Sequence, residues 1–450
     1  MMTTIGVLLF VVGLAFSIWF HELGHFFWAR RFRMRVTQFM VGFGPTLWSK
    51  RIGETEHGVK VIPLGGYIRI VGMMPPGEDD LAGRRVGRIR QLVEEVRGAS
   101  LLDVRPDDGD RVFYRKPWWQ RVVVMSAGPA HNLVLAFILF TIILVGFGIP
   151  TPTRTVEAVS ECVLPATAAV EATCATPVNA TGALCETGPD CALPVAAPAR
   201  EAGFRDGDEI LAVDGRAVDD WSAVQAVIRG SPNEELSVTV RRGGEEQTLR
   251  VTPLPNQVRT SADPEDTEVV TVGFLGLSPV QVYVPQPVTS VPGQVGAFIV
   301  VAAEKLIGIP ERIPQLVRAA FLGEQRDING PIGIVGVGRI SGETFGLPAE
   351  QAPLQEKFIF FLGLLASLNM VLFLFNLVPL YPLDGGHVAG ALWEKARSVL
   401  ARVRRKPDPG PFDTARLMPV AYVVASVFIV LSGLLLVADI VNPITLDQLQ

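Results

Sequence analysis

The 450-residue chain has little charge: only 19% of its residues are Asp, Glu, Lys or Arg, whereas 49% are hydrophobic. Soluble proteins carry about 25% charged residues. The low charge therefore excludes an ordinary soluble protein of this length. Crossing a bilayer as a helix takes about 20 mostly apolar residues. Four runs meet that requirement, at 4–28, 120–148, 357–380 and 416–441.

The first apolar run lacks the features of a cleaved signal peptide. No basic residue precedes Ile5, and no small-x-small cleavage site follows the run. We therefore expect a retained transmembrane helix. A fifth apolar patch, at 295–309, is shorter and contains Glu304 and Lys305. It predicts an amphipathic helix rather than a further crossing.

Cysteine is absent everywhere except in one thirty-residue stretch. The spacings of 12, 11 and 6 residues contain no CxxC pair, which a zinc knuckle would be expected to have. An even, clustered set in an oxidising compartment instead predicts two disulfides, and the sequence leaves all three pairings open. The four residues are Cys162, Cys174, Cys185 and Cys191.

Loop charges predict how the chain crosses the membrane. Segment 30–117 has 17 basic and 11 acidic residues, and segment 395–408 has six basic residues and one acid. The positive-inside rule places both in the cytoplasm. The acidic segment 149–356, with 14 basic and 27 acidic residues, then lies outside together with both termini. The basic runs at 30–35 and 402–406 fit topology signals and lipid headgroup contacts better than nucleic-acid sites.

Only five histidines are present, and two of them lie in the stretch FHELGHFFWARRF at 20–32. The pattern HExxH on a helix puts His21 and His25 one turn apart on one face, where both imidazoles can bind one zinc ion. Glu22 then lies beside the metal and can act as general base toward a zinc-bound water. Three such groups at the end of a membrane helix are costly unless they serve a function.

A catalytic zinc ion also needs a third protein ligand and one open position for water. The stretch NLVPLYPLDGGH at 376–387 follows the third apolar run and supplies two candidates, Asp384 and His387. The predicted topology brings it to the same leaflet as the HExxH pattern. Gly385 and Gly386 are expected to let the backbone turn sharply there. Prolines 379 and 382 are expected to end the helix.

Two further regions have recognisable secondary structure. Segments 36–50 and 59–73 are rich in β-branched and aromatic residues and predict a hairpin or small sheet associated with the membrane. Residues 199–253 predict a strand (EILAVDG), a short helix (DWSAVQAVIRG) and a hairpin around Gly-Gly. This order resembles a bacterial PDZ domain, whose first strand we expect near 154–159.

Together these motifs resemble the site-two protease family of intramembrane zinc metalloproteases, in particular the branch of the regulator of sigma-E protease. HExxH in a first membrane helix, NxxPxxxLDG in a later one and a PDZ domain between them carry the resemblance. The segments GFGPTLWS, PLGGYIRIVGM, RVFYRKPWWQRVVVMSAGPAHN and NGPIGIVGVG add to it. The chain departs from the pattern in having a single recognisable PDZ domain and a Cys-rich insertion.

The resemblance implies functional residues. The zinc ligands would be His21, His25 and Asp384, with Glu22 as the general base. The substrate would be held by Asn376, Pro379, Gly65, Gly66 and Tyr67, the last three in a membrane-reentrant β element that pairs with the substrate. Asn132 of GPAHN matches a family asparagine, but the sequence assigns it no role.

The predicted fold is a polytopic α-helical membrane protein with about four crossings, a membrane-associated β-hairpin and an inserted extracytoplasmic PDZ-like α+β domain. Its segments are 1–75 (first membrane helix and β-hairpin), 76–117 (cytoplasmic insertion), 118–150 (second membrane helix), 151–290 (PDZ-like domain with a Cys-rich insertion at 160–195), 291–356 (amphipathic helix and connector), 357–394 (third membrane helix), 395–415 (basic loop) and 416–450 (fourth membrane helix).

The predicted function is intramembrane proteolysis with one catalytic Zn²⁺ in a bacterial inner membrane. Expected partners are the lipid bilayer, single-pass membrane proteins such as anti-sigma factors, remnant signal peptides, and a peptide C-terminus at the PDZ domain. No nucleic-acid partner is expected. The alternative is a PDZ-containing membrane receptor or scaffold with a structural metal site. A structural zinc site is usually closed by four protein ligands, and the sequence supplies three good ones.

Overall fold

The computed structural model describes residues 2–76, 88–164, 168, 172–179, 182–186, 190–259, 269–324, 326–328 and 330–446. The chain forms two compact units. Unit 1 comprises residues 1–146 and 287–450, and unit 2 comprises residues 147–286. The predicted cytoplasmic insertion at 76–117 falls partly outside the described residues, which resume at helix α2 (Arg88–Leu101).

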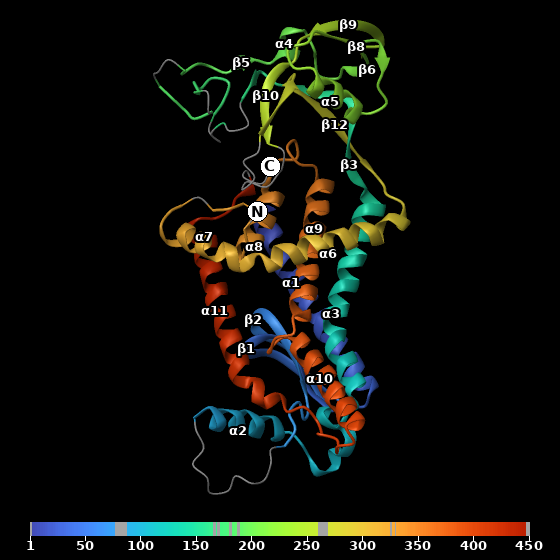
Figure 1. The fold of residues 1–450 in the computed structure, drawn as a ribbon, viewed down its shortest axis with the longest axis vertical. Coiled ribbons are helices and arrows are strands. Elements are labelled where there is room, and N and C mark those ends of the chain that lie inside the picture. The colour runs from blue at the N-terminus through green and yellow to red at the C-terminus, as the bar shows by residue number, and fades with distance from the viewer. Residues whose placement is uncertain are drawn as a thin grey trace. The chain divides into compact units, whose positions relative to one another are not determined.

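Unit 1 is built on four long apolar helices that run lengthwise through it (Figure 1). They are α1 (Met2–Arg31), α3 (Trp118–Thr141, continued by the π-helical turn η3, Ile142–Phe147), α9 (Leu354–Leu377) and α11 (Met418–Val441). Each coincides with one of the four predicted apolar runs. The start of α1 and the end of α11 lie at one end of the unit, and α2 lies at the other.

A fifth helix is also long and apolar enough to cross a membrane by length and composition. It spans Val288–Ile307 and includes η4 (Val288–Ser290) and α6 (Val291–Ile307). The sequence predicts an amphipathic helix in this region. In Figure 1, α6 runs across the long helices rather than along them, and α7 (Ile309–Phe321) follows it.

Helix α8 (Ile334–Gly346) packs along the first half of α1. The Ser341 hydroxyl donates to the carbonyl of Gly6 over 3.0 Å. The first turn of α8 is capped by Asp439 of α11, whose carboxylate accepts from the Gly336 amide at 2.7 Å and pairs with Arg326 at 2.9 Å. These buried polar contacts connect α1, α8 and α11 at one end of unit 1.

The predicted β element forms from two long strands, β1 (Val36–Ile52) and β2 (Thr55–Ile70). Both strands fold back, so that Phe39 has a partner on each side, Ile68 and His57. The Phe39 ring lies in the core between α1 and β2, whereas Trp48 and Ile62 are exposed. An element with one packed face and exposed apolar side chains fits the predicted association with the membrane.

Ion pairs join the segments at the α2 end of unit 1. Arg35 pairs with Asp108 at 2.6 Å, both side chains being buried, and Arg121 at the start of α3 pairs with Glu394. The elements here are α2, the 3-10 turns η1 (Pro106–Arg111), η2 (Phe113–Arg115) and η5 (Thr414–Leu417), and helix α10 (Asp384–Val403). These are the segments whose loop charges predict the cytoplasmic side.

Unit 2 has a sheet in the order β12-β3-β6-β8-β9, with β7 paired to β6, around a core that includes Val156, Ile210 and Val240. The predicted elements are confirmed: Asp220 caps α5, Gly243 and Gly244 turn the β8–β9 hairpin, and β3 supplies the first strand. The elements are β3 (Ile149–Val159), β4 (Cys162–Val163), β5 (Val195–Ala196), α4 (Pro198–Glu201), β6 (Glu209–Val213), β7 (Arg216–Ala217), α5 (Trp221–Gly230), β8 (Leu236–Arg242), β9 (Glu245–Val251), β10 (Leu254–Arg259), β11 (Val269–Phe274) and β12 (Leu277–Val284).

The Cys-rich insertion of unit 2 contains two disulfides. Cys162 pairs with Cys174, and Cys185 pairs with Cys191. The structure thus selects one of the three pairings that the sequence leaves open, and each cysteine bonds to a near neighbour in sequence.

Candidate metal centre

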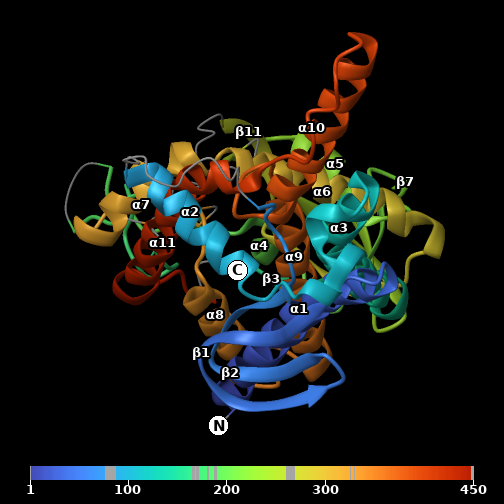
Figure 2. The same ribbon diagram turned by 90° about the horizontal axis from the view of Figure 1, so that it is seen from below.

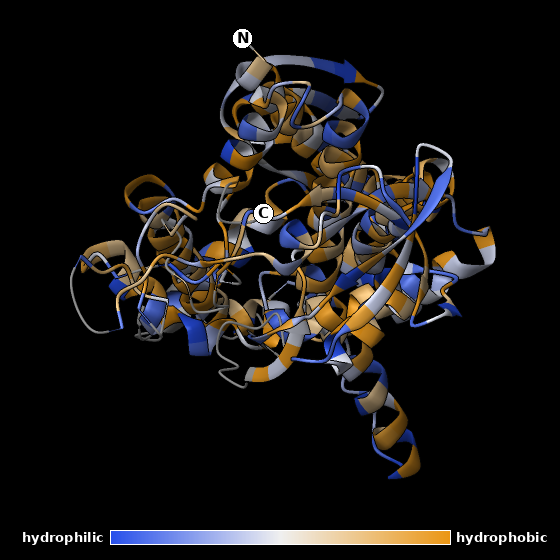
Figure 3. Cartoon of the chain, turned by 90° about the horizontal axis from the view of Figure 1, so that it is seen from above, coloured by the Kyte–Doolittle hydropathy of each residue, from blue (hydrophilic) through white to orange (hydrophobic). Residues whose placement is uncertain are grey.

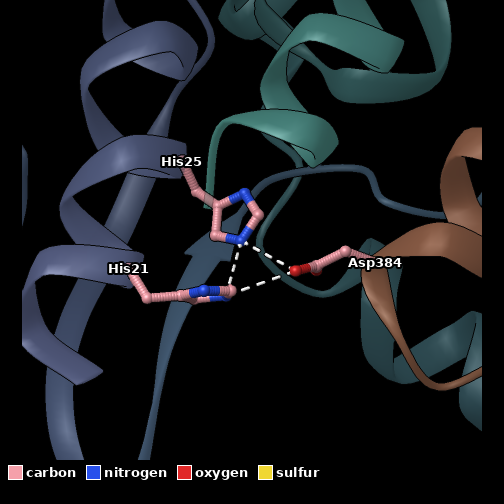
Figure 4. Close-up of side chains that lie close together, drawn as sticks. All are labelled: His21, His25 and Asp384. Atoms are coloured by element: carbon pink, nitrogen blue, oxygen red, sulfur yellow. Dashed lines mark hydrogen bonds and ion pairs between the residues drawn. The ribbon is translucent and has the colours of Figure 1, made fainter. Parts of the chain in front are cut away.

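Three predicted ligands from two distant segments meet in unit 1 (Figure 4). The Nε2 atoms of His21 and His25 lie 3.2 Å apart, and each lies 3.2 Å from Oδ2 of Asp384. The histidines project from α1, and the aspartate is the first residue of α10. Within the described ranges, this is the one group of three His, Cys, Asp or Glu side chains whose ligand atoms converge in this way.

The spacing of these three atoms fits a tetrahedral zinc ion. Zinc binds imidazole nitrogen and carboxylate oxygen at about 2.0–2.1 Å, so adjacent ligand atoms of a tetrahedron lie roughly 3.3–3.4 Å apart. The observed separations of 3.2 Å are close to that edge. Three protein ligands leave the fourth position for water, which is the arrangement of catalytic rather than structural zinc sites.

Both imidazoles are oriented by contacts from α3. Nδ1 of His25 donates to the carbonyl of Val124 at 2.7 Å, which leaves the Nε2 lone pair free for the metal. The side-chain amide of fully buried Asn132 lies 3.0 Å from Nδ1 of His21. When Nε2 of His21 binds a metal, Nδ1 carries the proton and needs an acceptor. Oδ1 of Asn132 has no partner among the described residues, so it can accept that hydrogen bond once the amide is turned to point Oδ1 at His21.

Two glycines let α1 and α3 approach closely at the ligands. A Cβ at Gly128 of α3 would collide with Nε2 of His25 and would lie 2.7 Å from Nε2 of His21. A Cβ at Gly24 of α1 would collide with the carbonyl of Ala127. Small residues at such crossings are typical of membrane helices. Here they also place the backbone of α3 directly against the metal ligands.

Glu22, the predicted general base, is buried beside the two histidines. Strand β2 runs against it: a Cβ at Gly66 would lie 3.0 Å from Cγ of Glu22 and 2.9 Å from Ile18. The β element therefore borders the acidic group that would act on a metal-bound water.

The backbone at Gly385 and Gly386 differs from the expectation. A sharp turn was predicted there, but both residues belong to the first turn of α10, and neither has a positive φ angle. Their lack of a side chain serves packing instead. A Cβ at Gly385 would collide with the Val378 carbonyl, and one at Gly386 would lie 2.7 Å from the Tyr381 amide nitrogen. The glycines thus let α10 start tightly against the end of α9, which positions Asp384.

His387 and the predicted substrate-binding residues lie outside the group of three converging ligand atoms. His387 packs edge-on against Tyr381, with ring centroids 4.6 Å apart. The amide of Asn376 donates to the Leu372 carbonyl of its own helix at 2.9 Å, and Pro379 is exposed. Gly65 has a positive φ of 90°. The Tyr67 ring stacks near Phe43, with centroids 6.3 Å apart.

Sequence reasoning did not assign roles to Asn132 and Gly128, although a signal was present. The two residues lie four positions apart on an apolar helix and so share one face. A second buried pair was also missed: the amide of Asn369 in α9 donates to the Ser17 hydroxyl of α1 at 2.8 Å. Ser17 precedes His21 by one helical turn. Polar residues deep in apolar helices are the signal that points to both sites.

Two histidines one turn apart, an aspartate completing a tetrahedral face and an adjacent glutamate define a metallohydrolase whose centre is carried by apolar, membrane-type helices. Comparisons with known proteins agree. The model of Peptidase family M50 matches residues 9–406. Zinc metalloprotease Rip1 of Mycolicibacterium smegmatis is 36% identical over 461 residues, covering all of both chains. Rip1 of Mycobacterium tuberculosis is 34% identical over 459 residues, again over both full lengths. Metalloprotease MmpA of Caulobacter vibrioides is 29% identical over 411 residues, 86% of this chain and 85% of MmpA.

The chain therefore belongs to peptidase family M50, the site-two protease family. It is an intramembrane zinc metalloprotease, as the sequence predicts. The alternative of a receptor or scaffold with a structural metal site is not retained, because relatives named as zinc metalloproteases match the whole chain.

Proposed function

We propose that the chain hydrolyses peptide bonds within or near the transmembrane helix of single-pass membrane proteins, at the cytoplasmic side of a bacterial inner membrane. His21, His25 and Asp384 would hold one zinc ion, which would lower the pKa of a bound water and polarise the scissile carbonyl. The observation that carries this assignment is the triangle of ligand atoms with 3.2 Å sides, which leaves one zinc position open.

Glu22 acts as the general base of the proposed reaction. It accepts a proton from the attacking water and passes it to the leaving amine. Its burial beside the ligands and its contact with β2 support this role. Asn132 and the Val124 carbonyl position the two imidazoles and do not themselves touch substrate.

The substrate backbone binds as an added strand along β2. A helical substrate must unwind before its carbonyls can reach the metal, and each unsatisfied backbone group in hydrocarbon costs several kcal/mol. Residues 66–69 pair with 38–41 on one side. Gly65, Gly66 and Tyr67 present the other side to the unwound segment, which gains backbone hydrogen bonds there. Asn376, in the last turn of α9, and Pro379, just beyond the end of that helix, hold the far side of the substrate.

The proposed topology has four crossings, made by α1, α3, α9 and α11, with α6 lying along the outer interface. The start of α1 and the end of α11 share one end of unit 1, as an even number of crossings requires (Figure 1). The basic segments 30–117 and 395–408 place the opposite end in the cytoplasm. Both termini and residues 147–286 are then extracytoplasmic, where the two disulfides are stable.

Unit 2 is proposed to act as a PDZ domain that selects substrates already trimmed outside the membrane, such as anti-sigma factors or remnant signal peptides. A cleft between α5 and residues 272–277 supports this role. Trp221, Ile228 and Arg229 line one wall. Such a cleft suits an extended peptide end, and the domain can also restrict access by size.

The experiment that tests this function compares wild type with Glu22→Gln, both purified in detergent, on a tagged single-pass anti-sigma-type helix. Zinc content is measured on both proteins. We expect wild type to cut, Glu22→Gln not to cut, and both to hold about one zinc per chain. A chelator should stop the wild-type reaction, and added zinc should restore it.

Two outcomes would contradict the proposal. Cleavage by Glu22→Gln at the wild-type rate would remove the general base from the mechanism. Loss of zinc in Glu22→Gln would make Glu22 a ligand instead. Mapping the cut by mass spectrometry then tests the location: cleavage only in the extracytoplasmic part of the substrate would overturn the proposed topology.

A further inference from the structure

The second half of α10 carries an apolar stripe that the described parts of the chain leave uncovered. Trp393 is 58% exposed and Val403 is 75% exposed. At 100° per residue, the exposed apolar residues of this half fall within about 120° of the helix circumference. They are Leu392, Trp393, Ala396, Val399, Leu400 and Val403.

The opposite face of the same half-helix is already occupied by the loop that follows it. The carboxylate of Glu394 accepts from the Phe412 amide at 2.6 Å. The Ser398 hydroxyl donates to Asp408 at 3.0 Å, and the Arg397 guanidinium lies over the Phe412 ring. The loop therefore packs on the polar face and leaves the apolar stripe free.

Basic residues border the stripe on both sides. Lys395 and Arg402 lie along one edge of the helical wheel, and Arg397 and Arg404 lie along the other. Segment 395–408 contains six basic residues and one acid. An apolar stripe between two basic rows is the pattern of a helix that lies in a membrane interface containing anionic lipid.

The position of α10 agrees with that pattern. The helix begins at Asp384, among the membrane helices, and slopes toward the α2 end of unit 1 (Figure 1). In the view from below, its second half projects sideways beyond the other helices of unit 1 (Figure 2). The hydropathy colouring of this projecting helix alternates between apolar and polar residues (Figure 3). A helix that leaves the bundle sideways can run along a bilayer surface, whereas one that continued along the membrane normal could not.

We propose that residues 392–403 form an in-plane anchor, with the apolar stripe buried in the cytoplasmic leaflet and the exposed side chains of Arg402 and Arg404 bound to anionic phospholipid headgroups. A second copy of the chain fits less well, because pairing two such stripes would bring like-charged rows together. The proposal rests on the orientation argued above. Since α10 presents Asp384 at its other end, the anchor fixes the helix that carries the third metal ligand.

The test places a fluorophore on each face of α10 in the full-length protein. The four native cysteines are all disulfide-bonded, so an introduced cysteine can be labelled alone. Leu400→Cys reports on the stripe, and Ala401→Cys is the matched control on the other face. Both are reconstituted into vesicles of phosphatidylcholine with or without phosphatidylglycerol. Quenching is measured with nitroxide lipid and with aqueous iodide.

We expect the nitroxide lipid to quench the label at 400 several-fold more than the label at 401, with iodide showing the reverse order. Equal iodide quenching of the two labels would overturn the proposal. Protection of position 400 from both quenchers would also overturn it, because it would mean that protein covers the stripe.

A second pair of variants tests the choice of lipid. The double variant Arg402→Glu with Arg404→Glu should lose lipid quenching at position 400 in phosphatidylglycerol vesicles. The control Arg402→Lys with Arg404→Lys should retain it. Equal lipid contact in the two would overturn the assignment to anionic lipid. None of these readouts requires proteolysis, so they can fail while the proposed function stands.

Discussion

Replacing Asn132 should weaken zinc binding without touching a ligand. The fully buried amide faces Nδ1 of His21 at 3.0 Å. Asn132→Leu keeps a similar volume but offers no acceptor for the Nδ1 proton that a metal-bound imidazole carries. Asn132→Asp keeps an acceptor. Comparing the two variants therefore distinguishes the effect of the lost hydrogen bond on zinc binding from the effect of altered packing.

The expected magnitude follows from the burial of the contact. Among the described residues, only the side-chain amide of Asn132 is seen to face Nδ1 of His21, and its Oδ1 becomes the acceptor once the amide is turned. In the leucine variant that N–H is left unsatisfied, which costs about 1–3 kcal/mol. That cost appears only in the metal-bound state, because metal binding at Nε2 of His21 places the proton on Nδ1. It corresponds to about 5–150-fold weaker zinc binding, which includes the roughly 10–100-fold effect of residues that orient metal-bound histidines.

The assay is competition for zinc between the detergent-solubilised protein and a chromophoric chelator, read together with cleavage of a tagged helix. Asn132→Leu should release zinc at lower chelator concentration, and its activity should return at high free zinc. Asn132→Asp should hold zinc at least as tightly as wild type. The reasoning would be refuted if Asn132→Leu bound zinc normally, or if Asn132→Asp lost as much affinity as Asn132→Leu.

Three further predictions concern other parts of the molecule. Gly128→Ala should abolish zinc binding, because its methyl group would occupy the space of the histidine Nε2 atoms. The control Gly363→Ala in α9 has no atom within 4 Å of its Cβ position and should bind zinc normally. Measuring the zinc content of both variants checks this prediction. Asn376→Leu should lower kcat/KM on a transmembrane substrate at unchanged zinc content; unchanged kinetics would exclude Asn376 from substrate binding. Burial acts to raise the pKa of Asp208, but hydrogen bonds from Arg242 and a backbone amide outweigh it, so the pKa lies below its usual range. The pKa of an unfolded Asp is about 4, so the stability that this carboxylate gives unit 2 should be fully present above about pH 4. It should be lost as the pH falls through the lower pKa of the folded state. Hydrogen exchange should show this decline in the stability of unit 2, and Asp208→Asn should remove the pH dependence.

The helices and the candidate metal ligands could be predicted from sequence because each rests on a local pattern. Long apolar runs give α1, α3, α9 and α11, since a bilayer leaves a chain few alternatives to a helix. HExxH fixes His21 and His25 on one face through helical periodicity alone. Asp384 required the family resemblance, because periodicity along the chain does not choose between it and His387.

What the sequence did not reveal depends on packing between distant segments. The role of Gly128 becomes visible only when α3 lies against α1, and Gly385 and Gly386 prove to serve helix packing rather than a sharp turn. The two disulfides were expected, but three pairings of four cysteines are equally consistent with the spacing. In each case the missing information was which backbones come into contact.

The three candidate ligands come from two helices: two from α1 and one from α10. His21 and His25 share α1, and α3 holds them through Val124, Gly128 and Asn132. Asp384 alone comes from α10, whose first turn rests on the end of α9. Variants along the contact between α1 and α3 should therefore change zinc affinity, because they disturb two candidate ligands at once. A change in the position of α10 displaces only the third candidate ligand, Asp384. If the second half of α10 lies in the membrane interface, the lipid surface itself bears on the geometry of the metal site.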